Sequence, residues 1–222
     1  MNLEQLAKKA LRMEFLTAKQ GLELFEKLPL GELMYIGHSL RKIHHPDQEV
    51  TWIIDRNMNI TNACISGCKF CNFYRPVSNS KVYITPRDEY HRKIEELFCI
   101  GGDQLLLQGG LHPRLSLIWY EDLFRYLKKQ YPTLKLHALG PPEVVHLAKM
   151  DHLTIPETLS RLMAAGLSSL PGAGAEILVD RVRKILSPVK CTAGEWLEVM
   201  KEAHKLGLTT SATMMFGHVE TI

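Results

Sequence analysis

Three closely spaced cysteines are the residues of this sequence best suited to chemistry. Cys64, Cys68 and Cys71 lie in one segment of eight residues, CISGCKFC. Thiols this close in sequence have poor geometry for disulfides and good geometry for a metal site. Thiolate is the usual protein ligand of iron–sulfur clusters, and Gly67 lets the backbone bend close to the metal. Three ligands would leave one iron of a four-iron cluster open, as a catalytic metal requires.

Two other interpretations of these cysteines exist. A structural zinc site usually shows two separated ligand pairs and closes its coordination sphere. No second pair is evident here, although His91 or Cys99 could supply a fourth ligand. The three cysteines could also simply be buried. We expect the cluster, and we expect Cys99 and Cys191, the other two of the five cysteines, to be small buried apolar residues.

Composition narrows the class of protein. Of the 222 residues, 45% are hydrophobic and 23% are charged, which is ordinary for a globular protein with a sizeable core. The net charge of +3 comes without a basic block, which argues against nucleic acid as a partner. No apolar stretch approaches membrane-spanning length, and the first residues lack the layout of a secretory signal. We therefore expect a cytoplasmic protein with no membrane partner.

The elements that must position the cysteines follow from hydrophobic patterning. Residues 1–49 predict an N-terminal helical segment, with a capping box at Thr17 and an interruption at Pro29. Residues 50–222 predict a core in which strands alternate with helices. The predicted strands are 50–54, 105–108, 133–137, 167–170 and 208–215. Single helices are predicted to begin at Pro86, Ser116 and Thr192, and another is predicted around 182–186. A separate pair of helices, broken at Pro156, is predicted after the third strand.

This alternation predicts an α/β fold of parallel βαβ units with right-handed crossovers. We expect part of a barrel, with the site at the carboxyl ends of the strands. Five strands cannot close such a barrel. Because the chain stops where the fifth predicted strand ends, we expect a truncated chain.

The spacing Cys-x3-Cys-x2-Cys, with Phe70 before the last cysteine, resembles the radical SAM superfamily. The resemblance implies a TIM-like partial barrel and a [4Fe–4S] cluster on Cys64, Cys68 and Cys71. It implies that the open iron binds S-adenosylmethionine, and that one-electron reduction yields a 5′-deoxyadenosyl radical that removes a hydrogen atom from the substrate. An electron donor such as flavodoxin or ferredoxin is then an implied partner.

Further segments resemble the menaquinone (futalosine) pathway branch of this superfamily, which also includes deazaflavin synthases. They are 73–75 (FYR), 108–110 (QGG), 137–143 (HALGPPE), 171–178 (PGAGAEIL) and 214–220 (MMFGHVE). The resemblance favours the cyclases of dehypoxanthinyl futalosine. In these cyclases the 5′-deoxyadenosyl radical removes a hydrogen atom from the ribose C4′ of the substrate. The resulting carbon radical adds to the aromatic ring of the same substrate, and loss of an electron and a proton restores aromaticity. Aminofutalosine synthases, deazaflavin (FO) synthases and a catalytically incompetent metal-binding fragment remain alternatives.

The same resemblance assigns roles to single residues. It implies cofactor contacts for Phe70, Gln108, Gly109, Gly110, His137, Glu176, Gly217 and Glu220. The candidates for a catalytic role, as groups that contact the substrate, are Tyr74, Arg75, His112 and His218, and the role is not assigned to any one of them. Without the resemblance, the glycine pair could be a plain turn and Glu176 an exposed loop carboxylate. The chain departs from the family at Ala173, where glycine is usual, and in lacking a sixth strand.

Overall fold

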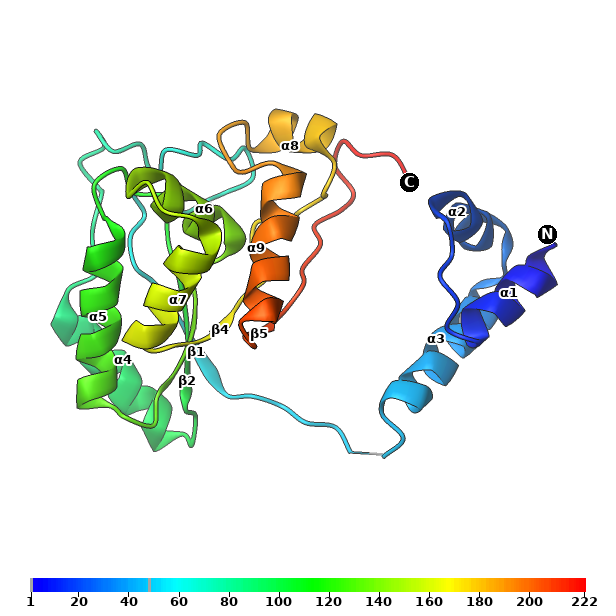
Figure 1. Ribbon diagram of the computed structural model, residues 1–222, viewed down its shortest axis with the longest axis horizontal. Helices are drawn as coiled ribbons and strands as arrows, with labels where there is room; N and C mark the ends of the chain where they lie inside the picture. The colour runs from blue at the N-terminus through cyan, green and yellow to red at the C-terminus, as the bar shows by residue number, and fades with distance from the viewer. Residues whose placement is uncertain (1, 48) are drawn as a thin grey trace. The chain divides into compact units, whose positions relative to one another are not determined.

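The computed structural model describes residues 2–47 and 49–222 (Figure 1). Most of the chain forms one unit, Ile53–Glu220, and the residues before it, up to Trp52, belong to a smaller N-terminal unit. The N-terminal unit contains α1 (Leu3–Leu11), α2 (Ala18–Lys27) and α3 (Leu30–His44). The capping box predicted at Thr17 is confirmed, because its side chain accepts the N–H of Gln20 while Gln20 caps Thr17 in return. A small apolar core holds these helices together: Leu6, Leu24, Leu28 and Ile36.

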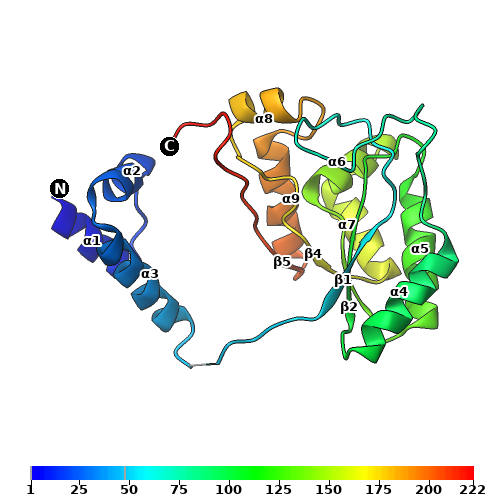
Figure 2. The same ribbon diagram turned by 180° about the vertical axis from the view of Figure 1, so that it is seen from behind.

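The larger unit alternates strands and helices as predicted. Its strands are β1 (Asp55–Asn59), β2 (Gln104–Gln108), β3 (Lys135–Ala138), β4 (Leu167–Leu170) and β5 (Thr209–Thr210). Its helices are α4 (Arg87–Cys99), α5 (Leu117–Gln130), α6 (Pro141–Met150), α7 (Ile155–Ala165), α8 (Asp180–Leu186) and α9 (Ala193–Lys205). The strands of the described residues pair in parallel in chain order (Figure 2). The chain is therefore an α/β protein with part of a TIM-like barrel.

The two faces of the sheet have different environments. Side chains that alternate along the strands are buried among the helices: Met58, Leu105, Leu107, Leu136 and Ala138. Burying one large apolar side chain contributes about 1.5–3 kcal/mol, so this face holds the unit together. The opposite face carries a row in which the exposed Asn57 and the half-buried Leu106, His137 and Ser169 lie in register. Asn59 and Gln108 form the next row, at the carboxyl ends of β1 and β2.

The first strand lies later in the chain than predicted. Residues 50–54 are outside the sheet, and Val50, Trp52 and Ile53 are exposed. The strand is instead the polar segment Asp55–Asn59, of which Met58 is the buried residue. Its backbone pairs with β2 from Asp55 onward, and tertiary pairing here overrides the β preference of the apolar run before it.

The fifth strand is shorter than predicted, with two residues in place of 208–215. Its partner β4 ends at Leu170, whose carbonyl accepts the N–H of Ser211 at 3.3 Å. Beyond that point Gly172 donates to the Ser211 hydroxyl at 3.0 Å, not to a backbone carbonyl. Regular pairing therefore stops where the neighbouring strand turns away.

One helix boundary and one helix cap also differ from the predictions. The break between α6 and α7 lies at 151–154, and Pro156 is within the first turn of α7, where proline is tolerated. Ser116 precedes α5, but its hydroxyl makes no capping bond. Asp151 takes that role, because its carboxylate accepts the N–H of Leu117 at 2.6 Å. None of the helices in the described ranges has the length and apolar character that crossing a bilayer requires.

Candidate active site

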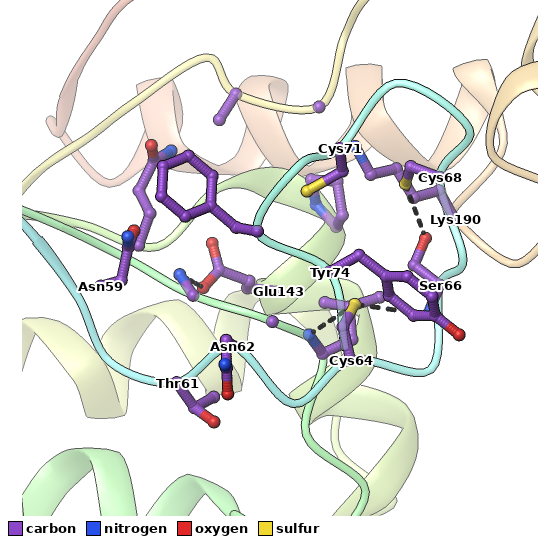
Figure 3. A pocket seen from close by; sticks show the side chains of 18 of the residues that line it. Asn59, Thr61, Asn62, Cys64, Ser66, Cys68, Cys71, Tyr74, Glu143 and Lys190 are labelled. Atoms are coloured by element: carbon purple, nitrogen blue, oxygen red, sulfur yellow. Dashed lines mark hydrogen bonds between the residues drawn. The ribbon is translucent and has the colours of Figure 1, made fainter. Parts of the chain in front are cut away.

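A cavity of about 260 Å³ lies at the carboxyl ends of β1–β4 (Figure 3). Its wall is built from the segments that follow these strands and from one residue between α8 and α9. The lining residues are Asn59, Thr61, Asn62, Cys64, Ser66, Cys68, Phe70, Cys71, Phe73, Tyr74, Tyr83, Gln108, Gly109, Gly110, Leu111, Pro142, Glu143, Ala173, Gly174, Glu176 and Lys190. Polar groups in a largely apolar cavity at this edge of a parallel sheet are the usual setting of a ligand site.

The three predicted cysteines all line this cavity. The Cys64 sulfur accepts hydrogen bonds from the backbone N–H groups of Ser66, at 3.3 Å, and Leu111, at 3.2 Å. The Ser66 hydroxyl lies 3.1 Å from the Cys68 sulfur. Hydrogen bonds to sulfur stabilise thiolates and help to set the potential of iron–sulfur clusters. Burial alone acts in the other direction and raises the pKa of the Cys64 thiol.

Backbone hydrogen bonds hold the cysteine loop at both ends. At its base, Cys64 donates to the carbonyl of Arg75 and Arg75 donates to that of Asn62, both at 3.0 Å. Near its tip, Lys69 donates to the carbonyl of Leu186 at 2.9 Å. The loop is therefore fixed to the body of the unit and presents its thiols to the cavity.

Gly110 lets the cysteine loop lie directly on the end of β2. A Cβ at this position would be 2.1 Å from the Ala63 carbonyl oxygen and 2.8 Å from Cβ of Cys64. Neither contact can be relieved by moving a flexible side chain. The structure thus gives the glycine pair a role in packing the protein chain against itself, beside the ligand contact implied by the resemblance.

The donor set fits an iron–sulfur cluster better than a single zinc ion. No three His, Cys, Asp or Glu side chains in the described ranges are grouped to hold one metal ion. A single ion needs ligands that converge on one point, whereas a cubane spreads its protein ligands over separate corners. Neither of the suggested fourth ligands lines the cavity. His91 hydrogen-bonds Tyr131 and Tyr126, and Cys99 is exposed at the end of α4, which corrects its predicted burial; Cys191 is buried as predicted.

Glu143 places a buried carboxyl group in the cavity wall. Its two oxygens accept the backbone N–H groups of Gly109, at 3.0 Å, and Gly140, at 2.7 Å. Burial raises the pKa of Glu143 to about 8, and the two amide hydrogen bonds offset part of that shift. The group therefore supports the Gly109 turn and sits where a proton can be held near neutral pH.

Glu176 enters the cavity from the turn after β4. Its φ is +45°, a left-handed conformation that is costly for a residue with a side chain and is common at functional sites. Its carboxylate lies 3.0 Å from Nζ of Lys190 and 3.8 Å from the guanidinium of Arg183. Ala173, where the family usually has glycine, has a negative φ and carries no such strain.

The structure brings most of the predicted site residues together. Besides the cysteines, the cavity is lined by Phe70, Tyr74, Gln108, Gly109, Gly110 and Glu176. Six others lie outside its lining: Arg75, His112, His137, Gly217, His218 and Glu220.

The outlying residues have local partners. The Arg75 guanidinium folds back onto the carbonyls of Asn72 and Tyr74. His112 is buried, and its Nδ1 accepts the N–H of Arg114. His137 is on the same sheet face as Gln108 but one row deeper, where its ring pairs with Ser169 at 2.7 Å.

The C-terminal candidates bind one another. Glu220 accepts the backbone N–H groups of Gly217 and His218, and its pKa falls to about 2 chiefly through the Gly217 bond. The His218 ring is 2.7 Å from the same carboxylate. Met215 donates to the Glu176 carbonyl at 3.2 Å, so this segment runs beside the Glu176 turn without lining the cavity.

Two charged residues of the lining, Glu143 and Lys190, were not among the site residues predicted from the sequence. Glu143 had a signal, since it is the third residue of a helix that starts with two prolines after β3, where an acid that caps the helix is expected. Lys190 had none, because nothing in the segment around it indicates that the chain folds back to the cysteine loop.

Comparisons with known proteins agree with this geometry. The radical SAM superfamily profile matches residues 58–222. A relative from Streptomyces coelicolor, named cyclic dehypoxanthine futalosine synthase, is 39% identical over 93% of this chain and 52% of its own length. One from Methanococcoides burtonii, named 5-amino-6-(D-ribitylamino)uracil–L-tyrosine 4-hydroxyphenyl transferase, is 41% identical over 92% of this chain and 56% of its own. The chain thus spans about half the length of the curated relatives it matches.

Solved structures show the same fold at low sequence identity. HydG, a maturase of the [FeFe]-hydrogenase, matches with a TM-score of 0.71 at 15% identity over 97% of this chain and 46% of its own. Methylornithine synthase (PylB) matches with a TM-score of 0.65 at 15% identity over 92% of this chain and 57% of its own. Members of the matched superfamily use a [4Fe–4S] cluster and S-adenosylmethionine. With the profile covering most of the sequence, the chain belongs to the radical SAM superfamily.

Proposed function

We propose that Cys64, Cys68 and Cys71 hold a [4Fe–4S] cluster beside a bound S-adenosylmethionine, and that the reaction is the cyclisation of dehypoxanthinyl futalosine. The observation that carries the proposal is the presence of three cysteines in the lining of one cavity at the carboxyl ends of parallel strands. The hydrogen bonds to the Cys64 sulfur and the close packing at Gly110 support it. The futalosine branch is supported by the relative from Streptomyces coelicolor.

When bound, the cluster and S-adenosylmethionine supply the one-electron chemistry that removes a hydrogen atom from the substrate. The residues of the chain supply placement. The Glu176 carboxylate can accept hydrogen bonds from two ribose hydroxyls. Aromatic side chains of Phe70, Phe73 and Tyr74 give the cavity an apolar wall, which limits the access of water. Firm placement matters because a radical reacts with whatever group is nearest.

The proposal also implies a reductant and a compartment. A small electron carrier such as flavodoxin or ferredoxin would supply the electron. Free thiols and an oxygen-sensitive cluster require a reducing environment such as the cytoplasm.

A second candidate rests on the transferase relative, whose 41% identity is no lower than that of the futalosine relative. In this case the substrates are tyrosine and 5-amino-6-(D-ribitylamino)uracil, as in the name of that relative. The radical for this second reaction would be made in the same cavity. The two candidates differ in substrate and not in the cysteine site.

One assay separates them. The protein is reconstituted anaerobically with iron and sulfide and supplied with S-adenosylmethionine, a reductant and either substrate set, and products are identified by mass spectrometry. The cyclase predicts 5′-deoxyadenosine and a product lighter than dehypoxanthinyl futalosine by two hydrogen atoms. Turnover of tyrosine with the uracil would favour the second candidate. If the Cys64→Ala variant is as active as the wild type, both candidates are wrong.

A further inference from the structure

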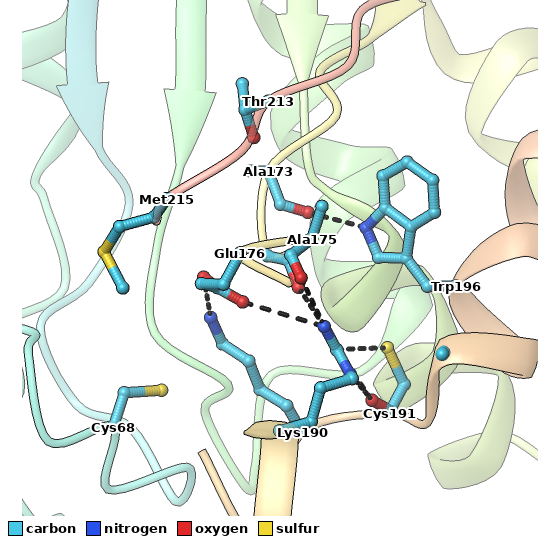
Figure 4. Close-up of polar contacts among 12 residues, drawn as sticks. Cys68, Ala173, Ala175, Glu176, Lys190, Cys191, Trp196, Thr213 and Met215 are labelled. Carbon is cyan, nitrogen blue, oxygen red and sulfur yellow. Dashed lines mark hydrogen bonds and ion pairs between the residues drawn. The ribbon is translucent and has the colours of Figure 1, made fainter. Parts of the chain in front are cut away.

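Lys190 places an ammonium group inside the cavity, from the segment between α8 and α9 (Figure 4). Its side chain is 15% exposed. Its Nζ donates a hydrogen bond to Oε1 of Glu176 at 3.0 Å. The same Nζ lies 5.4 Å from the centre of the Phe70 ring, within the range of a cation–π contact. The lysine is therefore held from two sides and has a defined place.

These two contacts join segments that are far apart in the sequence. Phe70 belongs to the cysteine loop, between Cys68 and Cys71, and Glu176 belongs to the turn after β4. Burial lowers the pKa of Lys190, but the Glu176 carboxylate and the Cys68 thiol outweigh it and hold the pKa above its ordinary value. The side chain is thus a cation at neutral pH and lies close enough to respond to charge on the cysteine loop.

The neighbouring cation, Arg183, has a different task. Its guanidinium is 4% exposed and donates to the carbonyls of Gly174, Ala175 and Cys191 at 2.7–3.0 Å. Those bonds fix the backbone of the Glu176 turn. Among the described residues that line the cavity, Lys190 is the one with a basic side chain. Its charge is therefore the one best placed to act on the cavity.

We propose that Lys190 is a positioning residue with two effects on the cavity. Its ammonium group holds the Glu176 carboxylate in place, and its positive charge makes the proposed cluster easier to reduce. Reduction adds one negative charge next to thiolates that are already negative. A buried cation stabilises that added charge more than a solvated one, because charges interact more strongly where water is excluded. Net charge and solvent exposure are among the factors that set cluster potentials. This inference rests on the proposed cluster and not on which substrate is used.

The test is the midpoint potential of the reconstituted cluster, measured by an anaerobic redox titration followed by electron paramagnetic resonance, without S-adenosylmethionine. Lys190→Gln removes the charge and is expected to shift the potential to more negative values. Lys190→Arg keeps the charge and is expected to restore most of the wild-type value. Glu176→Gln removes a negative charge and is expected to shift the potential in the opposite direction. Lys184→Gln, at an exposed site on α8, controls for net charge and is expected to leave the potential unchanged.

A charge effect predicts that Lys190→Gln and Glu176→Gln shift the midpoint potential in opposite directions. A purely structural role does not predict this. The Glu176→Gln arm keeps the test decisive if no variant at 190 assembles a cluster. A wild-type potential in Lys190→Gln, or equal shifts in Lys190→Gln and Lys190→Arg, would overturn the inference while leaving the proposed function standing. Failure of the wild type itself to assemble a cluster would overturn both.

Discussion

The Glu143 carboxylate accepts the backbone N–H of Gly109 at 3.0 Å, although the two residues are 34 positions apart in the sequence. Its other oxygen accepts the N–H of Gly140 at 2.7 Å, at the start of α6. One buried side chain thus fastens the end of β2 to the segment after β3. Both attached segments border the cavity that contains the cysteines.

Replacing this carboxyl group by an amide has a pH-dependent effect. In Glu143→Gln the NH2 group faces a backbone N–H and accepts nothing, whereas a protonated carboxyl keeps acceptor capacity on both oxygens. We expect the variant to be less stable by about 1–3 kcal/mol in mild acid.

The pH dependence follows from the direction of the shift. The pKa of Glu143 is raised in the folded state to about 8 from an ordinary value of 4.5. Its stabilising contribution is therefore fully present below the unfolded value and is lost as the pH rises through about 8. The glutamine does not titrate, so the difference in unfolding free energy should narrow as the pH rises. Anaerobic urea unfolding of both proteins in steps of pH measures this, and a constant or widening difference would contradict it.

Gly110→Ala tests the packing of the cysteine loop on β2. The new Cβ would lie 2.1 Å from the Ala63 carbonyl oxygen, so the loop must move. Overpacking of this kind costs about 1–3 kcal/mol, and we expect a matching loss of stability together with reduced iron content after reconstitution. Gly194→Ala is the matched control, because its Cβ would meet nothing closer than 3.9 Å. Equal iron content in the two variants would show that the close approach is not needed.

Arg183→Met tests the support of the Glu176 turn. The change leaves the buried carbonyls of Gly174, Ala175 and Cys191 without their donor. Because an unsatisfied buried group costs about 1–3 kcal/mol, we expect an overall loss of more than about 2 kcal/mol in urea unfolding. Arg181→Met, at an exposed site on the same helix, is expected to stay within about 0.5 kcal/mol of the wild type. Comparable losses in the two variants would argue against a special role for Arg183.

Local signals in the sequence predicted most of the fold. The capping box at Thr17, the helix start at Thr192 and the strands β2 and β4 agree with the structure because neighbouring residues determine them. The polar strand β1 was misplaced because pairing with β2 decides its position.

The candidate site also contains some features that neighbouring residues determine and others that depend on distant parts of the chain. The cysteine loop was predictable because its three cysteines lie within eight residues of the sequence. The resemblance implies a cofactor contact for His137, which the structure places in β3 one row below Gln108 and outside the cavity lining. Lys190 could not be predicted, since its place depends on how the segment after α8 returns to Phe70.

The cysteine site makes a prediction about each of its members. Cys64→Ala, Cys68→Ala and Cys71→Ala should each lose most of the bound iron, because each removes one of three ligands. Cys99→Ala should bind as much iron as the wild type, since Cys99 is exposed on α4 and does not line the cavity.

The most direct measurement is Mössbauer and electron paramagnetic resonance spectroscopy of anaerobically reconstituted protein, with and without S-adenosylmethionine. We predict four irons and four sulfides per chain, in a cluster whose reduced spectrum changes when S-adenosylmethionine is added. Zinc in the loop, or a cluster whose spectrum ignores S-adenosylmethionine, would contradict the account.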